Sequence, residues 1–340
     1  RRPWLLPVSA IVSIGIVAYV TTLTIYSQRL AKEEALTAAS QQFLIDLFRS
    51  PDPFAPADAD RGRNITVVEA LHIGEDRIQN ELATEPELRA ALLGTISDVY
   101  ASLDLPVEAG LLRADALQLE RELYGEQSPQ VVASKRALGG FLGLGEEMSQ
   151  ARVMLEEQLA TARQIFPADD AEVGLSEIAL GMFLRQAGEV DPSKELLLAG
   201  VDKLDPTNAD HARRMISALV VSAEFFGMES TTEALEAIQR ASDIAKKAFG
   251  EESLQAALVQ VRLASTMTTY GDYEGSEANF AVAIPVLEAQ LGENHSSTIS
   301  ALNNLGYLYS FRGDYVRAEQ IHRSLLVRNI AKHGPVHQAV

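Results

Sequence analysis

The stretch of sequence that decides the fold is LNNLGYLYSFRGDYVRAEQIHRSLLVRNIAKHG, residues 302–334. A polar turn at Gly313 separates two segments, and each segment carries one small residue, Gly306 or Ala318. Two antiparallel helices approach closely only where the side chain between them is no larger than that of Gly, Ala or Ser. The stretch therefore predicts a helical hairpin whose large apolar side chains, such as Leu305 and Leu325, pack towards the next hairpin.

The same unit recurs backwards along the chain. Its first marker is a large apolar residue followed by a smaller one, with spacings of 42, 42, 39, 44 and 42: Ile96, Leu138, Leu180, Leu219, Leu263 and Leu305. Its second marker is another small residue, which lies twelve positions after the smaller residue of the first marker, or fourteen in the fourth hairpin: Ala109, Ala151, Ser193, Ala234, Ser276 and Ala318. Because one hairpin cannot bury both its faces, we predict a stack of six hairpins between about residues 84 and 333. Pro285 falls inside the second helix of the fifth hairpin and should kink that helix or end it early.

Residues 302–334 resemble a tetratricopeptide repeat of the 42-residue kind found in kinesin light chains. Leu302, Leu305, Gly306, Tyr309 and Ala318 carry the resemblance. Where the family usually has an aromatic residue this unit has His322, and the usual proline near the end is Ile330. The resemblance implies an all-α solenoid that binds other proteins.

The N-terminal 29 residues form a predicted membrane anchor. Trp4–Tyr26 reads WLLPVSAIVSIGIVAYVTTLTIY without a charge, and roughly 20 apolar residues suffice to cross the hydrocarbon core. A signal peptide would need a shorter apolar core and a small-residue cleavage site. Two arginines precede the span while Arg29 and Lys32 follow it, so the charges give only a slight preference for an N-terminus inside. We expect a single-pass protein of the cell membrane.

A connector at residues 30–83 follows the anchor. Leu30–Arg49 has helical periodicity and should continue the membrane helix as a stalk. Residues 50–63 contain three prolines and no periodicity, which predicts a loop. Thr66–Leu82 is predicted to be helical again and to form a collar between the anchor and the array at 84–333.

A second resemblance covers the N-terminal third of the chain. The order is a span, then FLIDLFRSPDP (43–53), ITVVEALHIGEDRIQNEL (65–82) and PELRAALLGTISDVYASLDLPVEA (86–109). This order is similar to the segment after the catalytic domain in bacterial eukaryotic-like serine/threonine kinases with tetratricopeptide tails. The resemblance implies a kinase domain before Arg1 and an array outside the cytoplasm. At the other end, residues 334–340 resemble the opening of a truncated further repeat.

Composition and charge exclude several classes of function. The chain has no cysteine, which excludes disulfide scaffolds, thiolate metal sites and thiol catalysis. With 29 basic and 47 acidic residues its formal net charge is −18, which argues against non-specific binding to nucleic acid.

Catalytic and cofactor motifs are absent from the sequence. The glycine-rich loop, catalytic loop and metal-binding motif of kinases are missing, and the six histidines have no metal-ligand spacing. The cluster GGFLGLG, Gly139–Gly145, has no strand before it and no lysine after it. We therefore interpret it as the turn between the two helices of the second hairpin rather than as a phosphate loop. We expect no enzymatic activity, no cofactor and no metal in this chain.

Binding is the remaining function. In such solenoids the first helix of each hairpin lines the concave surface, and the small residues set the register. Positions expected to face inward form a candidate peptide-binding groove, composed of Arg136, Arg185, Arg214, Arg262, Asn303, Asn304 and Tyr307. Asparagine can hydrogen-bond a peptide backbone in both directions, and arginine can hold a carboxylate through two bonds.

Three functional hypotheses remain open at this point. The first is a membrane-anchored module that binds a protein or an extended peptide, as the sensory or scaffolding tail of a kinase. The second is a region that controls oligomerisation of an attached kinase, with the chain as a homodimer. The third is a stand-alone tetratricopeptide adaptor with no kinase.

Overall fold

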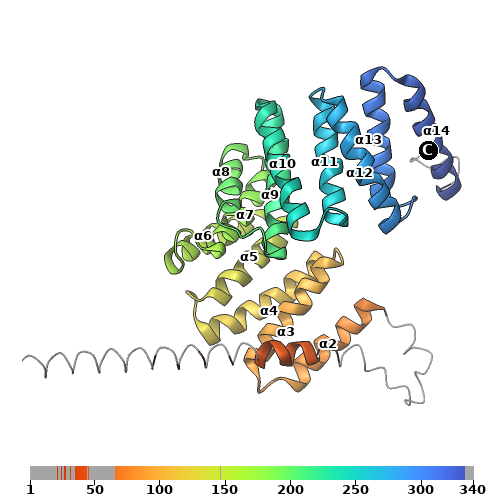
Figure 1. The fold of residues 1–340 in the computed structure, drawn as a ribbon. Coiled ribbons are helices and arrows are strands. Elements are labelled where there is room, and N and C mark those ends of the chain that lie inside the picture. The colour runs from red at the N-terminus through yellow and green to blue at the C-terminus, as the bar shows by residue number, and fades with distance from the viewer. Residues whose placement is uncertain are drawn as a thin grey trace, which may run out of the picture. The chain divides into compact units, whose positions relative to one another are not determined.

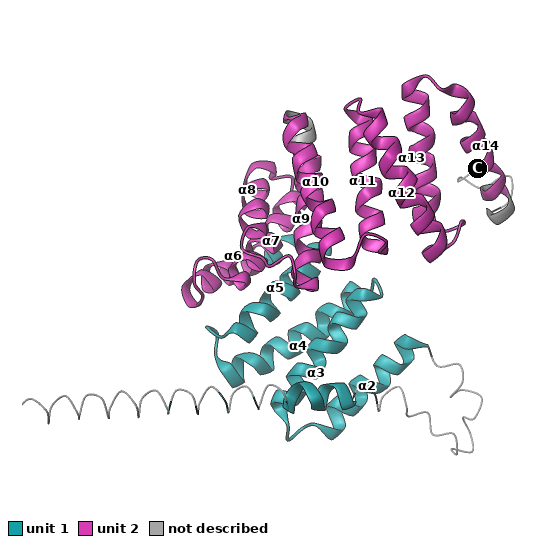
Figure 2. Cartoon of the chain, viewed as in Figure 1, with its two compact units in different colours: residues 1–151 teal, residues 152–340 magenta. Residues whose placement is uncertain are grey.

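The computed structural model describes residues 66–145 and 147–333, together with residues 21, 24, 27, 31, 35–43 and 45. Every regular element in these residues is an α-helix (Figure 1). The chain divides into two compact units, residues 1–151 and residues 152–340 (Figure 2). Each unit is described by itself below.

The helices follow one another with short turns between them. Unit 1 contains α2 Val67–Glu81, α3 Pro86–Ser102, α4 Pro106–Tyr124 and α5 Pro129–Leu144. Helix α6, Met148–Ile165, begins at the end of unit 1 and lies mostly in unit 2. Unit 2 continues with α7 Ala171–Gln186, α8 Val190–Val201, α9 Ala209–Glu229, α10 Thr231–Phe249, α11 Leu254–Thr269, α12 Tyr273–Leu291, α13 Ser296–Arg312 and α14 Tyr315–His333.

The six predicted hairpins correspond to the six successive helix pairs from α3 to α14. Five of these pairs lie within one unit and pack along their length: α3 with α4, α7 with α8, α9 with α10, α11 with α12, and α13 with α14. Successive hairpins of unit 2 also pack on one another, through α8 and α9, α10 and α11, and α12 and α13. The prediction of an all-α solenoid is therefore confirmed for the described residues.

Small residues lie where the two helices of a hairpin cross, as the sequence predicts. Ala109, Ser193, Ala234 and Ser276 are fully buried. At Gly181 an added Cβ would lie 2.9 Å from Cγ of Leu197, so only glycine allows α7 and α8 to approach this closely.

Helix ends are defined by local chemistry. The Ser253 hydroxyl accepts a hydrogen bond from the Ala256 amide and so caps the start of α11. Gly250 and Gly292 end α10 and α12 with φ values of 95° and 90°, which residues with a Cβ rarely adopt. A glycine at equivalent positions of two successive hairpins therefore terminates the second helix of each.

Unit 1 has a core that reaches back into the connector. Phe43, from the helical residues 35–43, is buried in one cluster with Leu71 and Ile78 of α2 and Ile96 of α3. The guanidinium of Arg77 lies 5.2 Å from the centre of the Phe43 ring. The connector helix is therefore docked on the array through an aromatic side chain.

Two local expectations differ from the structure, the first only in part. The sequence predicts that Pro285 either kinks its helix or ends it early, and the early end is wrong, because helix α12 runs through Pro285 to Leu291. Leu287 and Ile284 on the same helix are buried in the core shared with α11 and α13, and this packing offsets the lost backbone hydrogen bond. The cluster at 139–145 is not a turn, because α5 continues to Leu144 and buries Gly139 on one face. Tertiary packing outweighs the low helix propensity of glycine there.

Other expectations fall outside the described residues. The predicted span, residues 4–26, is described only at Thr21 and Thr24, and the loop at 50–63 and residues 334–340 are not described at all. Within the part of the chain that is described, none of the helices combines the length and the apolar character needed to cross a bilayer.

Candidate functional site

The first helices of the four hairpins in unit 2 share a run of polar side chains. These helices are α7, α9, α11 and α13; α7 contacts α9, and α11 contacts α13. We call this run the first-helix face, and define it by Arg185, Glu224, Arg262, Ser265 and Asn304.

Arg185 and Glu224 connect the first two of these helices. Nη2 of Arg185 lies 2.7 Å from Oε2 of Glu224, and both side chains are about half exposed. An exposed pair of this kind contributes about 0.2–1 kcal/mol to stability, so its main effect here is to hold both side chains in place.

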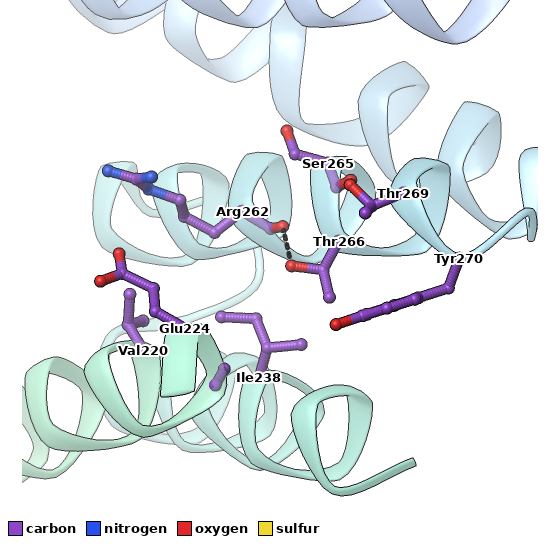
Figure 3. Close-up of a pocket in the computed structure, with 9 residues that line it drawn as sticks. Val220, Glu224, Ile238, Arg262, Ser265, Thr266, Thr269 and Tyr270 are labelled. Carbon is purple, nitrogen blue, oxygen red and sulfur yellow. Dashed lines mark hydrogen bonds between the residues drawn. The ribbon is translucent and has the colours of Figure 1, made fainter. Parts of the chain in front are cut away.

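A pocket of about 370 Å³ lies between α9, α10 and α11. Val220 and Ala223 of α9, Ile238 of α10 and the ring of Tyr270 form its apolar part. Glu224 and Arg262 lie at one end, with the hydroxyls of α11 along one side (Figure 3). The pocket therefore combines an apolar surface with groups that can hydrogen-bond.

The hydroxyl groups at this pocket are oriented by their own helix. Thr266 Oγ1 donates to the Arg262 carbonyl at 3.0 Å, and Thr269 Oγ1 donates to the Ser265 carbonyl at 3.1 Å (Figure 3). Because each hydroxyl proton is used within the helix, the oxygens offer lone pairs to a ligand.

Arg262 supplies the hydrogen-bond donors at the pocket. Its side chain is exposed, and its guanidinium forms no ion pair with any side chain that the structure describes. Since the nearby carboxylate of Glu224 is paired with Arg185, these three residues together carry one net positive charge. The pocket can therefore attract an anionic group.

The last helix of the face continues the polar run. Asn304 Nδ2 donates to Ser265 Oγ at 3.0 Å, which joins α13 to α11, and Asn303 is half buried beside it. Tyr307 is 51% exposed, and its ring packs edge-on against His322 with 5.6 Å between the ring centres.

The structure brings together only part of the predicted groove. Arg185 lies on α7, Arg262 lies on α11, and Asn303, Asn304 and Tyr307 lie on α13, all of them first helices of unit 2. Arg214 lies on α9, ten residues before Glu224, and does not line the pocket. Arg136 lies on α5 in unit 1.

Of the residues that line the pocket, the sequence analysis predicted only Arg262. It missed the polar residues Glu224, Ser265, Thr266, Thr269 and Tyr270 and the apolar residues Val220, Ala223 and Ile238. A signal was present for one of them. Glu224 lies 39 residues after Arg185, which equals the spacing between Leu180 and Leu219 in the same two hairpins. Opposite charges that lie one repeat apart can meet across neighbouring first helices.

A carboxylate joins the last two hairpins outside the pocket. Glu277 of α12 accepts hydrogen bonds from Tyr309 Oη at 2.8 Å and Arg312 Nη1 at 2.6 Å, and Arg317 of α14 lies 3.4 Å away. Burial raises the pKa of Tyr309, and the hydrogen bond to Glu277 adds to this effect, so the phenol keeps its proton.

No group of three or more His, Asp or Glu side chains within the described ranges could hold a metal ion.

The last hairpin matches a known family. Residues 298–339 match the tetratricopeptide repeat, and no curated protein sequence matches the chain.

Several solved structures share the fold at low sequence identity. One contains nearly identical tetratricopeptide-like repeats assigned to a kinesin light chain of Podosopora anserina (16% identity, TM-score 0.52, covering 59% of this chain and 95% of that chain). A second is BtubC from P. vanneervenii (15%, 0.56, 67% and 92%). A third is a Rap protein complexed with competence and sporulation factor (15%, 0.51, 81% and 72%). The described residues therefore have the fold of a tetratricopeptide solenoid of the kinesin-light-chain type.

Proposed function

We propose that the first-helix face of unit 2 binds an extended peptide or a peptide segment of a partner protein. The observation that supports this most directly is the continuous polar run from Arg185 and Glu224 through Arg262 to Asn304. Tetratricopeptide repeats generally mediate binding between proteins or to peptides, and this fold is typically non-catalytic.

The chemistry of the face fits an extended chain. The amide of Asn304 can donate to a peptide carbonyl while its oxygen accepts from a peptide N–H. Arg262 can hold a carboxylate of the ligand through two parallel hydrogen bonds. The apolar surface of Val220, Ile238 and Tyr270 can cover the aliphatic part of one ligand side chain.

Selection from a displayed peptide library tests this proposal. The full chain is immobilised and peptides are enriched on it, then re-bound to a variant carrying Arg262→Ala and Asn304→Ala. We expect the enriched peptides to lose at least about tenfold in affinity, because truncation of a central arginine commonly costs more than 1 kcal/mol.

The matched control is Arg240→Ala. Arg240 lies on α10, a second helix, and its side chain is exposed like that of Arg262, although it forms an ion pair with Asp202 at 2.9 Å. The control should bind the enriched peptides as well as the unchanged chain does. Equal binding by the Arg262/Asn304 variant would show that the ligand uses another surface.

We further propose that the chain is anchored in the cell membrane by residues 1–29 and forms the sensory or regulatory tail of a serine/threonine kinase. The uncharged stretch Trp4–Tyr26 supports the anchor, and the resemblance of residues 43–109 to kinase tails supports the attachment. The docking of Phe43 on unit 1 would then couple the stalk to the array. Protease protection in intact cells tests the topology, and we expect external protease to digest the array. Full protection in intact cells, with digestion after permeabilisation, would place the array inside.

Two alternatives remain as proposals. The array could control oligomerisation of the attached kinase, or the chain could be an adaptor without a kinase. A kinase domain upstream in the same open reading frame separates the adaptor from the other two.

A further inference from the structure

The pocket between α9, α10 and α11 carries opposite charges at one end. The guanidinium of Arg262 and the carboxylate of Glu224 point towards one another from α11 and α9 (Figure 3). Glu224 uses its Oε2 atom to bind Arg185, at 2.7 Å. Its other oxygen, Oε1, accepts no hydrogen bond from any residue that the structure describes, so this oxygen is available to a ligand.

This pocket offers more hydrogen-bond acceptors than donors. Thr266 and Thr269 use their hydroxyl protons on carbonyls of their own helix, so their oxygens accept further bonds but do not donate them. Glu224 Oε1 adds another acceptor, whereas Arg262 alone among the described residues that line the pocket carries a positive charge. A ligand that satisfies the pocket must therefore present several N–H or O–H donors beside one anionic group.

The rest of the pocket is apolar. Val220, Ala223 and Ile238 line its floor. The ring of Tyr270 lies at the end away from Arg262 (Figure 3). The volume of about 370 Å³ lies within the range of small-molecule sites, about 300–1,000 Å³.

We propose that this pocket binds a free α-amino acid with an apolar side chain. In such a molecule the ammonium and the carboxylate are attached to the same carbon atom, so both charges fit one end of the pocket. The carboxylate accepts two parallel hydrogen bonds from Arg262. The ammonium donates to Glu224 Oε1 and to Thr266 Oγ1, which lies one helical turn after Arg262 on α11. The apolar side chain of the ligand lies on Val220 and Ile238.

An internal residue of a peptide satisfies the same groups less well, because it has one backbone N–H and no ammonium. A free amino acid would also compete with peptides for Arg262, and would therefore regulate the peptide binding proposed above. This regulatory step rests on the proposed function, whereas the binding of an amino acid to the pocket does not.

Isothermal titration calorimetry of the full chain with L-leucine and L-phenylalanine tests the proposal. We expect both to bind, and glycine, which has no side chain to bury, to bind at least about tenfold more weakly. Isocaproate is leucine without its ammonium, and leucinamide is leucine without its carboxylate. Each should also bind at least about tenfold more weakly than L-leucine, because one charged group of the pocket would be left unpaired. These comparisons use the unchanged chain, so misfolding of a variant cannot imitate the result.

Glu224→Gln tests which group of the pocket binds the ammonium. This variant should bind L-leucine at least about tenfold more weakly but should not weaken isocaproate, which has no ammonium. The matched control is Asp202→Asn, which likewise removes an exposed ion pair between neighbouring hairpins, to Arg240 at 2.9 Å, but does not touch the pocket. The control should bind L-leucine as the unchanged chain does.

Several results would overturn the proposal. They are failure of both L-leucine and L-phenylalanine to bind, binding of glycine or isocaproate as tight as that of L-leucine, and equal weakening by Glu224→Gln and Asp202→Asn. If L-leucine fails to bind while enriched peptides still require Arg262, this inference fails and the proposed function stands. If L-leucine binds and no peptide is enriched, the amino-acid site stands and the peptide proposal fails.

Discussion

Ser276 of α12 donates a 2.8 Å hydrogen bond from its hydroxyl to the carbonyl oxygen of Ala264, twelve residues earlier on α11. Ser193 makes the equivalent bond to Gly181 at 2.7 Å. In unit 1 the direction is reversed, because Ser97 of α3 donates to Ala109 of α4 at 2.8 Å. The small residues of the repeat therefore do more than let two helices approach, since a hydroxyl at either position also ties one helix to the backbone of the other.

Replacing Ser276 by alanine should weaken the pairing of α11 with α12. The change removes a buried hydrogen bond and leaves Thr268, whose hydroxyl lies 2.7 Å from that of Ser276, without this partner. We expect a loss of about 1 kcal/mol, measured as faster hydrogen exchange of amides in α11 and α12. Ser324→Ala, at an exposed position of α14, should leave exchange unchanged. Equal exchange in both variants would show that the hydroxyl adds nothing to close packing.

Two glycine substitutions should have opposite effects. At Gly200 of α8 an added Cβ would lie 2.6 Å from the carbonyl oxygen of Gly174 on α7, so Gly200→Ala must push the helices apart. We expect a loss of about 1–3 kcal/mol. At Gly140 of α5 nothing lies within 4 Å, and Gly140→Ala should stabilise the helix by about 0.5–1 kcal/mol. Urea unfolding midpoints measure both effects, and a shift in the same direction for both would contradict this account.

The periodic part of the fold was predictable because the two helices of every hairpin approach closely and therefore need a small residue where they cross. The recurrence of a small residue about twelve positions after another predicts both helices and their crossing point, and the structure places Ala109, Ser193 and Ser276 there, fully buried.

Exceptions to the pattern depended on packing that no single residue reveals. The glycines at 139–145 read as a turn, yet α5 runs through Leu144 because Gly139 is buried on one face of the helix. The candidate site was predictable only in part. The repeat register predicts which positions of a first helix face inward, but it does not predict which side chains they contact on the neighbouring helices. Arg185 meets Glu224 because α7 and α9 cross at one particular register. The same register leaves Arg214 away from the pocket.

Glu120 of α4 should make the stability of unit 1 depend on pH. Burial raises the pKa of this carboxyl above its ordinary value of 4.5, although the Ser134 hydroxyl and the charge of Arg113 act in the opposite direction. Because its pKa is raised, the folded state binds the proton of Glu120 more tightly than the unfolded state does. The stability that this proton contributes is complete below pH 4.5, the ordinary pKa, and is lost as the pH rises through the folded-state pKa.

Glu120→Gln removes this titration. We expect the variant to be more stable than the unchanged chain at pH 7, with a difference that shrinks as the pH falls towards 4.5. Thermal unfolding of both chains at a series of pH values measures the difference. Because all other carboxyls are common to both chains, a difference that is constant with pH would mean that Glu120 has an ordinary pKa.

Pro285→Ala should stabilise unit 2. Pro285 lies in the interior of α12, where it cannot donate a hydrogen bond to the Ala281 carbonyl and where its ring crowds that carbonyl. The side chain is exposed, so alanine restores the backbone bond without opening a cavity. We expect a gain of about 1–3 kcal/mol, seen as a higher urea midpoint and slower exchange of amides at the C-terminal end of α12. Val282→Ala, at an exposed position of the same helix, should change the midpoint by less than about 0.5 kcal/mol. A destabilised Pro285→Ala chain would mean that the hairpin depends on a bend that only the proline provides.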